Sequence, residues 1–116
     1  MKLQGDGLLL RIFIGEGDRW HGAPLHEAIV GRAREAGLAG ATVLRGTMGF
    51  GAKSRIHTAK ILRLSEDLPI VIELVDTAEK IQKILPLLDE MVGDGMVTLE
   101  KVQVIAYRAS PRPGTP

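Results

Sequence analysis

Hydrophobic residues along the chain fall into runs typical of strands and into spacings typical of helices. The run LLLRIFI, residues 8–14, is rich in apolar and branched side chains and is followed by a glycine, so it predicts a first strand. Apolar positions then recur at helical spacing over residues 25–36. Pro24 before them suits a first helical turn and Gly37 after them suits a helix end. The chain therefore begins with a strand and a helix.

Three further extended segments follow this helix. Residues 42–44 begin a second strand, and a third extended region runs from about 57 to 75, with a bend near 65–67 before the stretch PIVIELV. The last strand is predicted over residues 97–107.

A second helix is predicted between the third and the last strand. Asp76 can cap its start, and Glu79 three residues later completes the spacing of a capping box. Pro86 lies inside this helix and removes a backbone hydrogen bond, so we expect a kink or a break near Leu85. The GDG turn at residues 93–95 ends the helix.

The order β-α-β-β-α-β predicts an α+β fold, a ferredoxin-like sandwich. Its four-stranded antiparallel sheet would carry both helices on one face. We expect one domain over residues 1–108 and a flexible tail over 109–116, because the ending ASPRPGTP holds three prolines and has no apolar periodicity.

The predicted strands are apolar on both faces. Ile70, Ile72 and Leu74 point to one side of the sheet, whereas Val71 and Val75 point to the other. A sheet face open to water normally carries polar side chains, and each large apolar side chain left in water forgoes about 1.5–3 kcal/mol. We therefore expect other copies of the chain to cover the second face in an obligate oligomer.

Composition excludes several classes of protein. The 116 residues carry a net charge of +1 without a basic cluster, and aromatic residues make up 3%, which argues against a nucleic-acid partner. Without cysteine there is no disulfide framework, thiolate metal site or cysteine nucleophile, and a cytoplasmic location is expected. Arg11 interrupts the N-terminal apolar run, which is too short for a membrane span, so no membrane insertion is expected.

Three glycine-bearing turns are candidates for ligand binding. They are GEG at residues 15–17, the segment RGTMGFGAKSRIH at residues 45–57 and GDG at residues 93–95. Successive backbone N–H groups in such turns can bind anions, and nearby arginine or lysine adds charge-assisted hydrogen bonds. The first turn lacks the spacing of a dinucleotide fingerprint and is interpreted as an ordinary turn. The other two should lie at the same end of a β-α-β-β-α-β sheet.

These two turns resemble those of the PII signalling proteins. Thr42-Val43, the GFG of residues 49–51 and the GDG before the last strand carry this resemblance, which covers roughly residues 8–108. A longer match joins the chain to a PII-related family of small bacterial and archaeal proteins that is known as a domain of unknown function. Its members resemble this chain through IGEGDRWHGAPLHEAIV, GLAGATVLRGTMGFG, SRIHTAKILRLSEDLPIVIELVD and MVTLEKV. The resemblance implies a homotrimer that binds an adenine nucleotide in clefts between subunits, with no required cofactor.

The residues expected to bind the nucleotide or its phosphates are Arg45, Gly46, Gly49, Phe50, Gly51, Lys53, Arg55, Gly93, Asp94, Gly95 and Arg108. Two positions depart from the PII pattern: Met96 stands where PII proteins have a lysine, and Ala106 stands at one of two arginine positions. Because each lost charge-assisted bond is worth about 1.5–3 kcal/mol, we expect AMP or ADP to bind more readily than ATP.

The resemblance also implies a regulatory role. Nucleotide would order the loop of residues 46–56, which would then signal to a partner, with a membrane transporter or a fluoride-exporter-type channel as candidates. Phe50 in this loop is expected either to anchor the loop on its own domain or to contact a base or partner.

Two alternatives stay open. One is a small enzyme that hydrolyses nucleotides in the same cleft, with Glu16, Asp94 or His57 as its base, although no catalytic arrangement is evident. The other is a structural, metal-tolerance-type trimer. His21 and His26 are five residues apart and do not share a helical face, so no metal site is expected.

Overall fold

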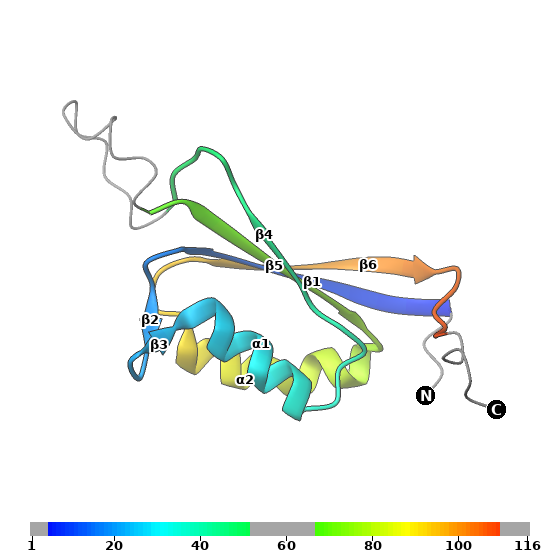
Figure 1. The fold of residues 1–116 in the computed structure, drawn as a ribbon. Helices are drawn as coiled ribbons and strands as arrows, with labels where there is room; N and C mark the ends of the chain where they lie inside the picture. The colour runs from blue at the N-terminus through cyan, green and yellow to red at the C-terminus, as the bar shows by residue number, and fades with distance from the viewer. Residues whose placement is uncertain (1–4, 52–66, 110–116) are drawn as a thin grey trace, which may run out of the picture.

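The protein is a four-stranded antiparallel sheet with two helices against one face, as the computed structural model shows for residues 5–51 and 67–109 (Figure 1). Its elements are β1 (Gly5–Gly15), β2 (Arg19–Trp20), β3 (Ala23–Pro24), α1 (Leu25–Glu35), β4 (Thr42–Arg45), β5 (Pro69–Asp76), α2 (Ala78–Met91) and β6 (Met96–Val104). The strand order in the main sheet is β4-β5-β1-β6, and each neighbouring pair is antiparallel. The predicted ferredoxin-like sandwich is confirmed.

The core lies between the sheet and the two helices. In β1 and β5, alternate side chains point toward the helices, and those from Leu10 to Ile14 and from Ile70 to Leu74 are between 0% and 6% exposed. The buried apolar residues are Leu10, Ile12, Ile14, Leu25, Ile29, Ala33, Ile70, Ile72, Leu74, Ile81, Ile84, Leu88 and Met91. At about 1.5–3 kcal/mol for each large apolar side chain removed from water, this layer supplies the main stabilisation of the single chain.

The start of α2 differs from the predicted capping box by one residue. The N-cap is Thr77, whose Oγ1 accepts a hydrogen bond from the Lys80 N–H at 3.4 Å. Asp76 is the last residue of β5 and is fully buried. Its carboxylate accepts from the Thr77 N–H at 2.6 Å and from the Ala39 N–H at 2.8 Å. The prediction was wrong because Asp76 is held by the segment between α1 and β4, which sequence spacing does not reveal.

Of the kink or break predicted near Leu85, the break is wrong, because α2 runs without interruption from Ala78 to Met91, and the kink stays a prediction. Proline removes the hydrogen bond to the carbonyl four residues earlier, that of Gln82. Both Gln82 and Pro86 are exposed, so water can hydrate this carbonyl and the helix continues.

Other boundaries shift at the ends of strands. A two-stranded hairpin, β2–β3, was not predicted; its turn contains His21 and Gly22 at positive φ, and the His21 ring stacks on Trp20 with 4.1 Å between ring centroids. The last strand ends at Val104 and not at residue 107. The Tyr107 hydroxyl instead donates to the Ala39 carbonyl at 2.9 Å, which holds the segment after β6 against the segment between α1 and β4.

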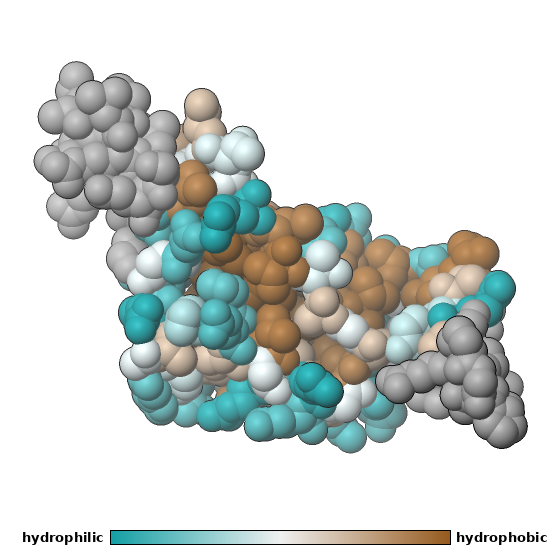
Figure 2. All heavy atoms as spheres, viewed as in Figure 1, coloured by the Kyte–Doolittle hydropathy of each residue, from teal (hydrophilic) through white to brown (hydrophobic). Residues whose placement is uncertain are grey.

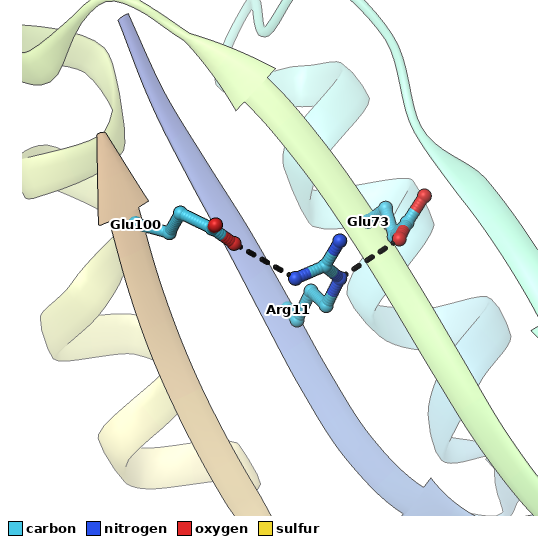
Figure 3. Close-up of polar contacts among 3 residues, drawn as sticks. All are labelled: Arg11, Glu73 and Glu100. Carbon is cyan, nitrogen blue, oxygen red and sulfur yellow. Dashed lines mark hydrogen bonds and ion pairs between the residues drawn. The ribbon is translucent and has the colours of Figure 1, made fainter. Parts of the chain in front are cut away.

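The face of the sheet opposite the helices, here called the open face, is apolar around an ionic centre. Arg11 donates from Nε to Glu73 and from Nη1 to Glu100, each at 2.9 Å, so that it joins three strands (Figure 3). The hydrogen bond to Glu73 raises the pKa of the Arg11 guanidinium, and the bond to Glu100 adds to this effect. Leu9, Phe13, Val71 and Val75 are half-buried around this centre, and Leu44 and Met96 are exposed. That other copies cover this face stays a prediction.

Candidate functional site

A pocket forms at the end of the sheet where the GFG and GDG turns meet. Its volume is about 370 Å³. It is lined by Phe13, Ile14, Gly15, Asp18, Gly49, Phe50, Gly51, Asp67, Pro69, Asp94, Gly95 and Met96. The expectation that these two turns lie at the same end of the sheet is therefore confirmed, and the pocket is the candidate site.

The GDG turn reaches the pocket because Gly95 lies directly against β1. A Cβ at this position would lie 2.5 Å from the Phe13 carbonyl oxygen, and its φ of +150° also favours glycine. Gly93 in the same turn has open space around it and does not line the pocket. The two glycines thus differ in role, because Gly95 allows the close approach of β6 to β1 and Gly93 does not contribute to it.

The GFG turn is held over the start of β5. The Gly46 N–H donates to the Pro69 carbonyl at 2.8 Å, and Gly49 packs against the Pro69 ring. Phe50 follows at the pocket wall and is 74% exposed. Its ring therefore is not an anchor buried in the core of its own domain, and it is available to a ligand or a partner.

The wall of the pocket is apolar and acidic. Phe13, Phe50 and Pro69 contribute apolar surface, and the aspartates Asp18, Asp67 and Asp94 contribute carboxylates. No cationic side chain occurs among the lining residues in the part of the chain that the structure describes. The side chains of this wall suit a flat apolar ring better than a phosphate, because a carboxylate only accepts hydrogen bonds and repels another anion, so a phosphate here would depend on the backbone N–H groups of the glycine turns.

The cations expected at the site are not brought into this pocket within one chain. Arg45 makes an ion pair with Glu16 at 2.5 Å and does not line the pocket. Arg108 follows Val104, which pairs with Gly5 at the opposite end of β1 from the pocket. Lys53 and Arg55 lie outside the described residues. If Arg108 contacts a ligand in this pocket, it must come from a second copy.

The turn at residues 15–17 has a role that the sequence did not predict. Its Glu16 N–H donates to the Leu68 carbonyl at 2.8 Å, and its Gly17 N–H donates to Asp67 Oδ1 at 3.0 Å. The turn thus holds the two residues that precede β5. The sequence held one signal for this contact. Asp67, whose carboxylate can accept a hydrogen bond, comes two residues before Pro69, and Pro69 pairs with Gly15 in the sheet.

The residues proposed for the two alternatives are not assembled into a second site. Glu16, a candidate base, is paired with Arg45 and does not line the pocket, and His57 lies outside the described residues. Within residues 5–51 and 67–109, no group of three or more metal-ligating side chains is arranged to hold an ion. Over the same ranges, neither helix has the length and apolarity that crossing a membrane requires.

Two curated relatives resemble the chain over most of its length. A UPF0166 protein of Aquifex aeolicus (strain VF5) is 41% identical over 99 residues, which are 84% of this chain and 91% of that protein. A UPF0166 protein of Methanocaldococcus jannaschii is 34% identical over 97 residues, which are 83% and 89% of the two chains.

Solved structures with the same fold are PII-like. CPII from Thiomonas intermedia K12, bound to ADP and bicarbonate, gives a TM-score of 0.63 at 20% identity and covers 89% of this chain and 91% of its own. A Thermus thermophilus protein described as a PII-like signaling protein gives a TM-score of 0.61 at 19% identity, covering 90% and 94%. At this level of identity, the likeness establishes the fold alone.

The family model DUF190, described as "Uncharacterized ACR, COG1993", matches residues 7–104, which takes in nearly all of the strands and both helices of the domain. With this match and with relatives above 30% identity, the chain belongs to the DUF190 (UPF0166) family, and it has the fold of PII-like proteins.

Proposed function

We propose that this protein is a PII-like regulatory protein that binds an adenine nucleotide, AMP or ADP more tightly than ATP. The observation that carries the proposal is the pocket of about 370 Å³ in which the GFG and GDG turns meet. Pockets for small ligands are typically apolar, with a few polar groups that fix orientation, and their volumes start at about 300 Å³. CPII of Thiomonas intermedia, which has the same fold, has been solved with ADP and with AMP.

The apolar part of the pocket wall suits the base of the nucleotide, and the GDG turn suits its phosphates. Phe13, Phe50 and Pro69 offer apolar surface to a flat ring. The backbone N–H groups of the GDG turn at residues 93–95 would bind the phosphates, as the resemblance to PII proteins implies. Because no cationic side chain lines the pocket in the described part of the chain, the cations that neutralise the phosphates would come from elsewhere. Arg108 is our first candidate for such a cation, and Arg45, Lys53 and Arg55 are further candidates from the sequence in and beside the loop of residues 46–56.

The position of Arg108 supports an assembly of several copies. It lies beyond the end of β6 that is remote from the pocket, so it reaches a ligand there only from another copy. The open face, with Leu44 48% exposed and Met96 53% exposed, supplies apolar surface for such an assembly. We propose a trimer in which the seam between two subunits completes each nucleotide site.

The preference for few phosphates rests on the small number of cations. Met96, which lines the pocket, stands where the PII pattern has a lysine, and each charge-assisted hydrogen bond is worth about 1.5–3 kcal/mol. A triphosphate would remain less neutralised than a mono- or diphosphate. We further propose that the loop of residues 46–56 carries the signal to a partner, and that a membrane transporter or a fluoride-exporter-type channel is the class of partner to test first.

Calorimetry on the purified full chain with AMP, ADP and ATP tests the nucleotide proposal, and light scattering gives the assembly state in the same samples. We expect a trimer that binds AMP and ADP, and binds ATP at least about tenfold more weakly. The Arg108→Ala variant should weaken binding of all three nucleotides. Arg34→Ala, which removes an exposed arginine of α1 that does not line the pocket, is the matched control and should bind as the native chain does.

A gain of function sharpens the same test. Met96→Lys should restore the missing cation and raise the affinity for ATP more than that for AMP. Val97→Lys places the same charge on the neighbouring side chain, which points to the other face of β6, and should change neither. A trimer that gives no heat with any adenine nucleotide would contradict the proposed function.

A further inference from the structure

The segment that follows β6 is tied by one side chain to a distant part of the same copy. After Val104 the chain has no regular secondary structure, and residues 105–109 are exposed. The Tyr107 hydroxyl nevertheless donates a hydrogen bond to the Ala39 carbonyl, 68 residues earlier in the chain, at 2.9 Å. Ala39 lies between α1 and β4, and β4 is the edge strand on the other side of the sheet from β6. Tyr107 therefore holds a segment that strand pairing no longer fixes.

The acceptor of this hydrogen bond is itself fixed to the core. The Ala39 N–H donates to Asp76 Oδ2 at 2.8 Å, and Asp76 is fully buried at the end of β5. Two residues before Ala39, the Gly37 carbonyl accepts from Lys80 Nζ of α2 at 2.8 Å. A group that binds the Ala39 carbonyl is thus held at a defined place relative to the sheet. Hydrogen bonds from Asp76 to Ala39 and from Ala39 to Tyr107 connect the buried core to the exposed segment after β6.

The ring of Tyr107 contributes to a second cavity, at the opposite end of the sheet from the nucleotide pocket. Its volume is about 410 Å³, and Val75 and Val104 are among the side chains that line it with Tyr107. No described residue lines both cavities. The ring and the hydroxyl of Tyr107 thus make separate contacts, and a substitution that removes only the hydroxyl leaves the apolar contacts in place.

Arg108 comes directly after this tyrosine. Among the residues that the structure describes, its guanidinium makes no hydrogen bond or ion pair, whereas Arg11 and Arg45 are both paired with glutamates. Arg108 is therefore a cation that the single copy leaves available to an anion. Binding by such a side chain costs less when the main chain that carries it is already fixed, since less conformational freedom is then lost.

We propose that Tyr107 is a positioning residue of the nucleotide site. Its hydrogen bond to Ala39 fixes the segment after β6, so that Arg108 is presented to the phosphates of a nucleotide bound by the neighbouring copy. Tyr107 does not touch the nucleotide and acts only through Arg108. This inference rests on the proposed function and names the contact within one copy that sets the place of the cation in the next.

The first test compares ADP with adenosine, which has no phosphate for Arg108 to neutralise. In Tyr107→Phe the ring stays and the hydroxyl is lost, so calorimetry on the full chain should show the dissociation constant for ADP raised at least about threefold. Adenosine, measured by its displacement of ADP, should bind the variant and the native protein equally. Thr42→Val, which removes the other hydroxyl that lines the second cavity, is the matched control and should bind ADP as the native chain does.

A double substitution tells whether Tyr107 acts through Arg108. If it does, Tyr107→Phe should weaken ADP binding in the native background and have no further effect once Arg108 has been replaced by alanine, because coupled residues do not contribute additively. Light scattering should give the native mass for each variant. The unfolding midpoint of Tyr107→Phe should stay close to the native one, because the lost hydrogen bond is exposed.

The outcomes separate this inference from the proposed function. If the native protein binds no ADP, the proposed function and the role of Tyr107 both fail. If it binds ADP but either Arg108→Ala or Tyr107→Phe leaves the affinity unchanged, nucleotide binding stands and Tyr107 does not position its cation. If the losses from the two substitutions add in full, or if adenosine loses as much affinity as ADP, Tyr107 acts independently of Arg108 and the inference is overturned.

Discussion

The two faces of one sheet are built from alternate residues of the same strands, and they differ in what one chain can complete. On the helix side, Leu10 in β1 pairs with Leu74 in β5, and both are fully buried. On the open face, the next residue Arg11 pairs with Glu73, with apolar Leu9 and Phe13 two positions to either side. The helix side is thus a buried core within one chain, and the open face is a partly exposed apolar surface around the Arg11 ion pairs.

This difference separates folding from assembly. The helix side can be buried by α1 and α2 of the same chain, so the fold is determined within one copy. The open face keeps its ion pairs hydrated in a single chain, while its apolar side chains remain partly in water. Figure 2 shows hydrophobic residues at the surface along the sheet, above the mostly hydrophilic surface of the two helices. Stability should therefore respond strongly to changes on one face, and assembly to changes on the other.

The largest effect should come from removing core volume on the helix side. Leu10→Ala removes a fully buried side chain and leaves a cavity, which should lower the free energy of unfolding by about 2–5 kcal/mol. Leu9→Ala is the matched change on the open face of the same strand and should cost about 1 kcal/mol at low protein concentration. Urea denaturation of both variants measures the gap. Equal losses would mean that the two faces are equally buried in the single chain.

The second largest effect should come from the close contact between Gly95 and the backbone of β1. Gly95→Ala would place a Cβ 2.5 Å from the Phe13 carbonyl oxygen. The start of β6, where Met96 pairs with Phe13, must then move away from β1. We expect a loss of about 1–3 kcal/mol in the free energy of unfolding. Gly93→Ala, two residues earlier with open space around it, is the control and should be nearly neutral. Thermal unfolding followed by circular dichroism distinguishes the two.

The helix side of the sheet is also the part that the sequence predicts well. Alternation in PIVIELV assigns Ile70, Ile72 and Leu74 to one face because the period of a strand is two residues, and this assignment is confirmed. The meeting of the two glycine turns followed from the element order in the same way. Local pattern and topology are enough for these features.

Contacts between distant segments could not be predicted in this way. Asp76 was expected to cap α2, but it binds the Ala39 N–H, 37 residues away. The turn at residues 15–17 was interpreted as an ordinary turn, yet it holds Asp67. The acidic wall of the pocket was likewise missed, because Asp18, Asp67 and Asp94 come from three separate segments. Such contacts depend on tertiary packing and leave no periodic signal.

A charge placed on the open face should affect assembly more than folding. Leu44→Asp puts a carboxylate at a side chain that is 48% exposed on this face, so it costs little in one chain but would be desolvated in a seam. We expect the apparent dissociation constant of the assembly to rise at least about tenfold. Val43→Asp, on the other side of the same strand and 39% exposed, is the control and should keep the native mass. Light scattering over a dilution series reports the result, and an unchanged mass for Leu44→Asp would place the seam elsewhere.

The smallest effect in the single chain should come from the ionic centre of the open face. Arg11 is bonded to Glu73, whose side chain is 30% exposed, and to Glu100, whose side chain is 57% exposed. Exposed ion pairs are weakened by hydration and salt, so Glu100→Gln should change the unfolding midpoint least and Glu73→Gln slightly more. In dilute protein, both differences should shrink further as salt is raised.

The same pair of substitutions then tells whether the open face becomes covered. If a second copy packs over the ion pairs, removing one carboxylate leaves Arg11 with an unmatched charge away from water, and the penalty grows. The raised pKa of Arg11 means that it stays charged at any ordinary pH and cannot escape this penalty by losing its proton. The loss caused by Glu73→Gln should therefore increase with protein concentration and become less sensitive to salt. A loss that stays small and salt-dependent up to concentrations at which the native chain is fully assembled would show that the ionic centre remains in water and that the seam lies on another surface.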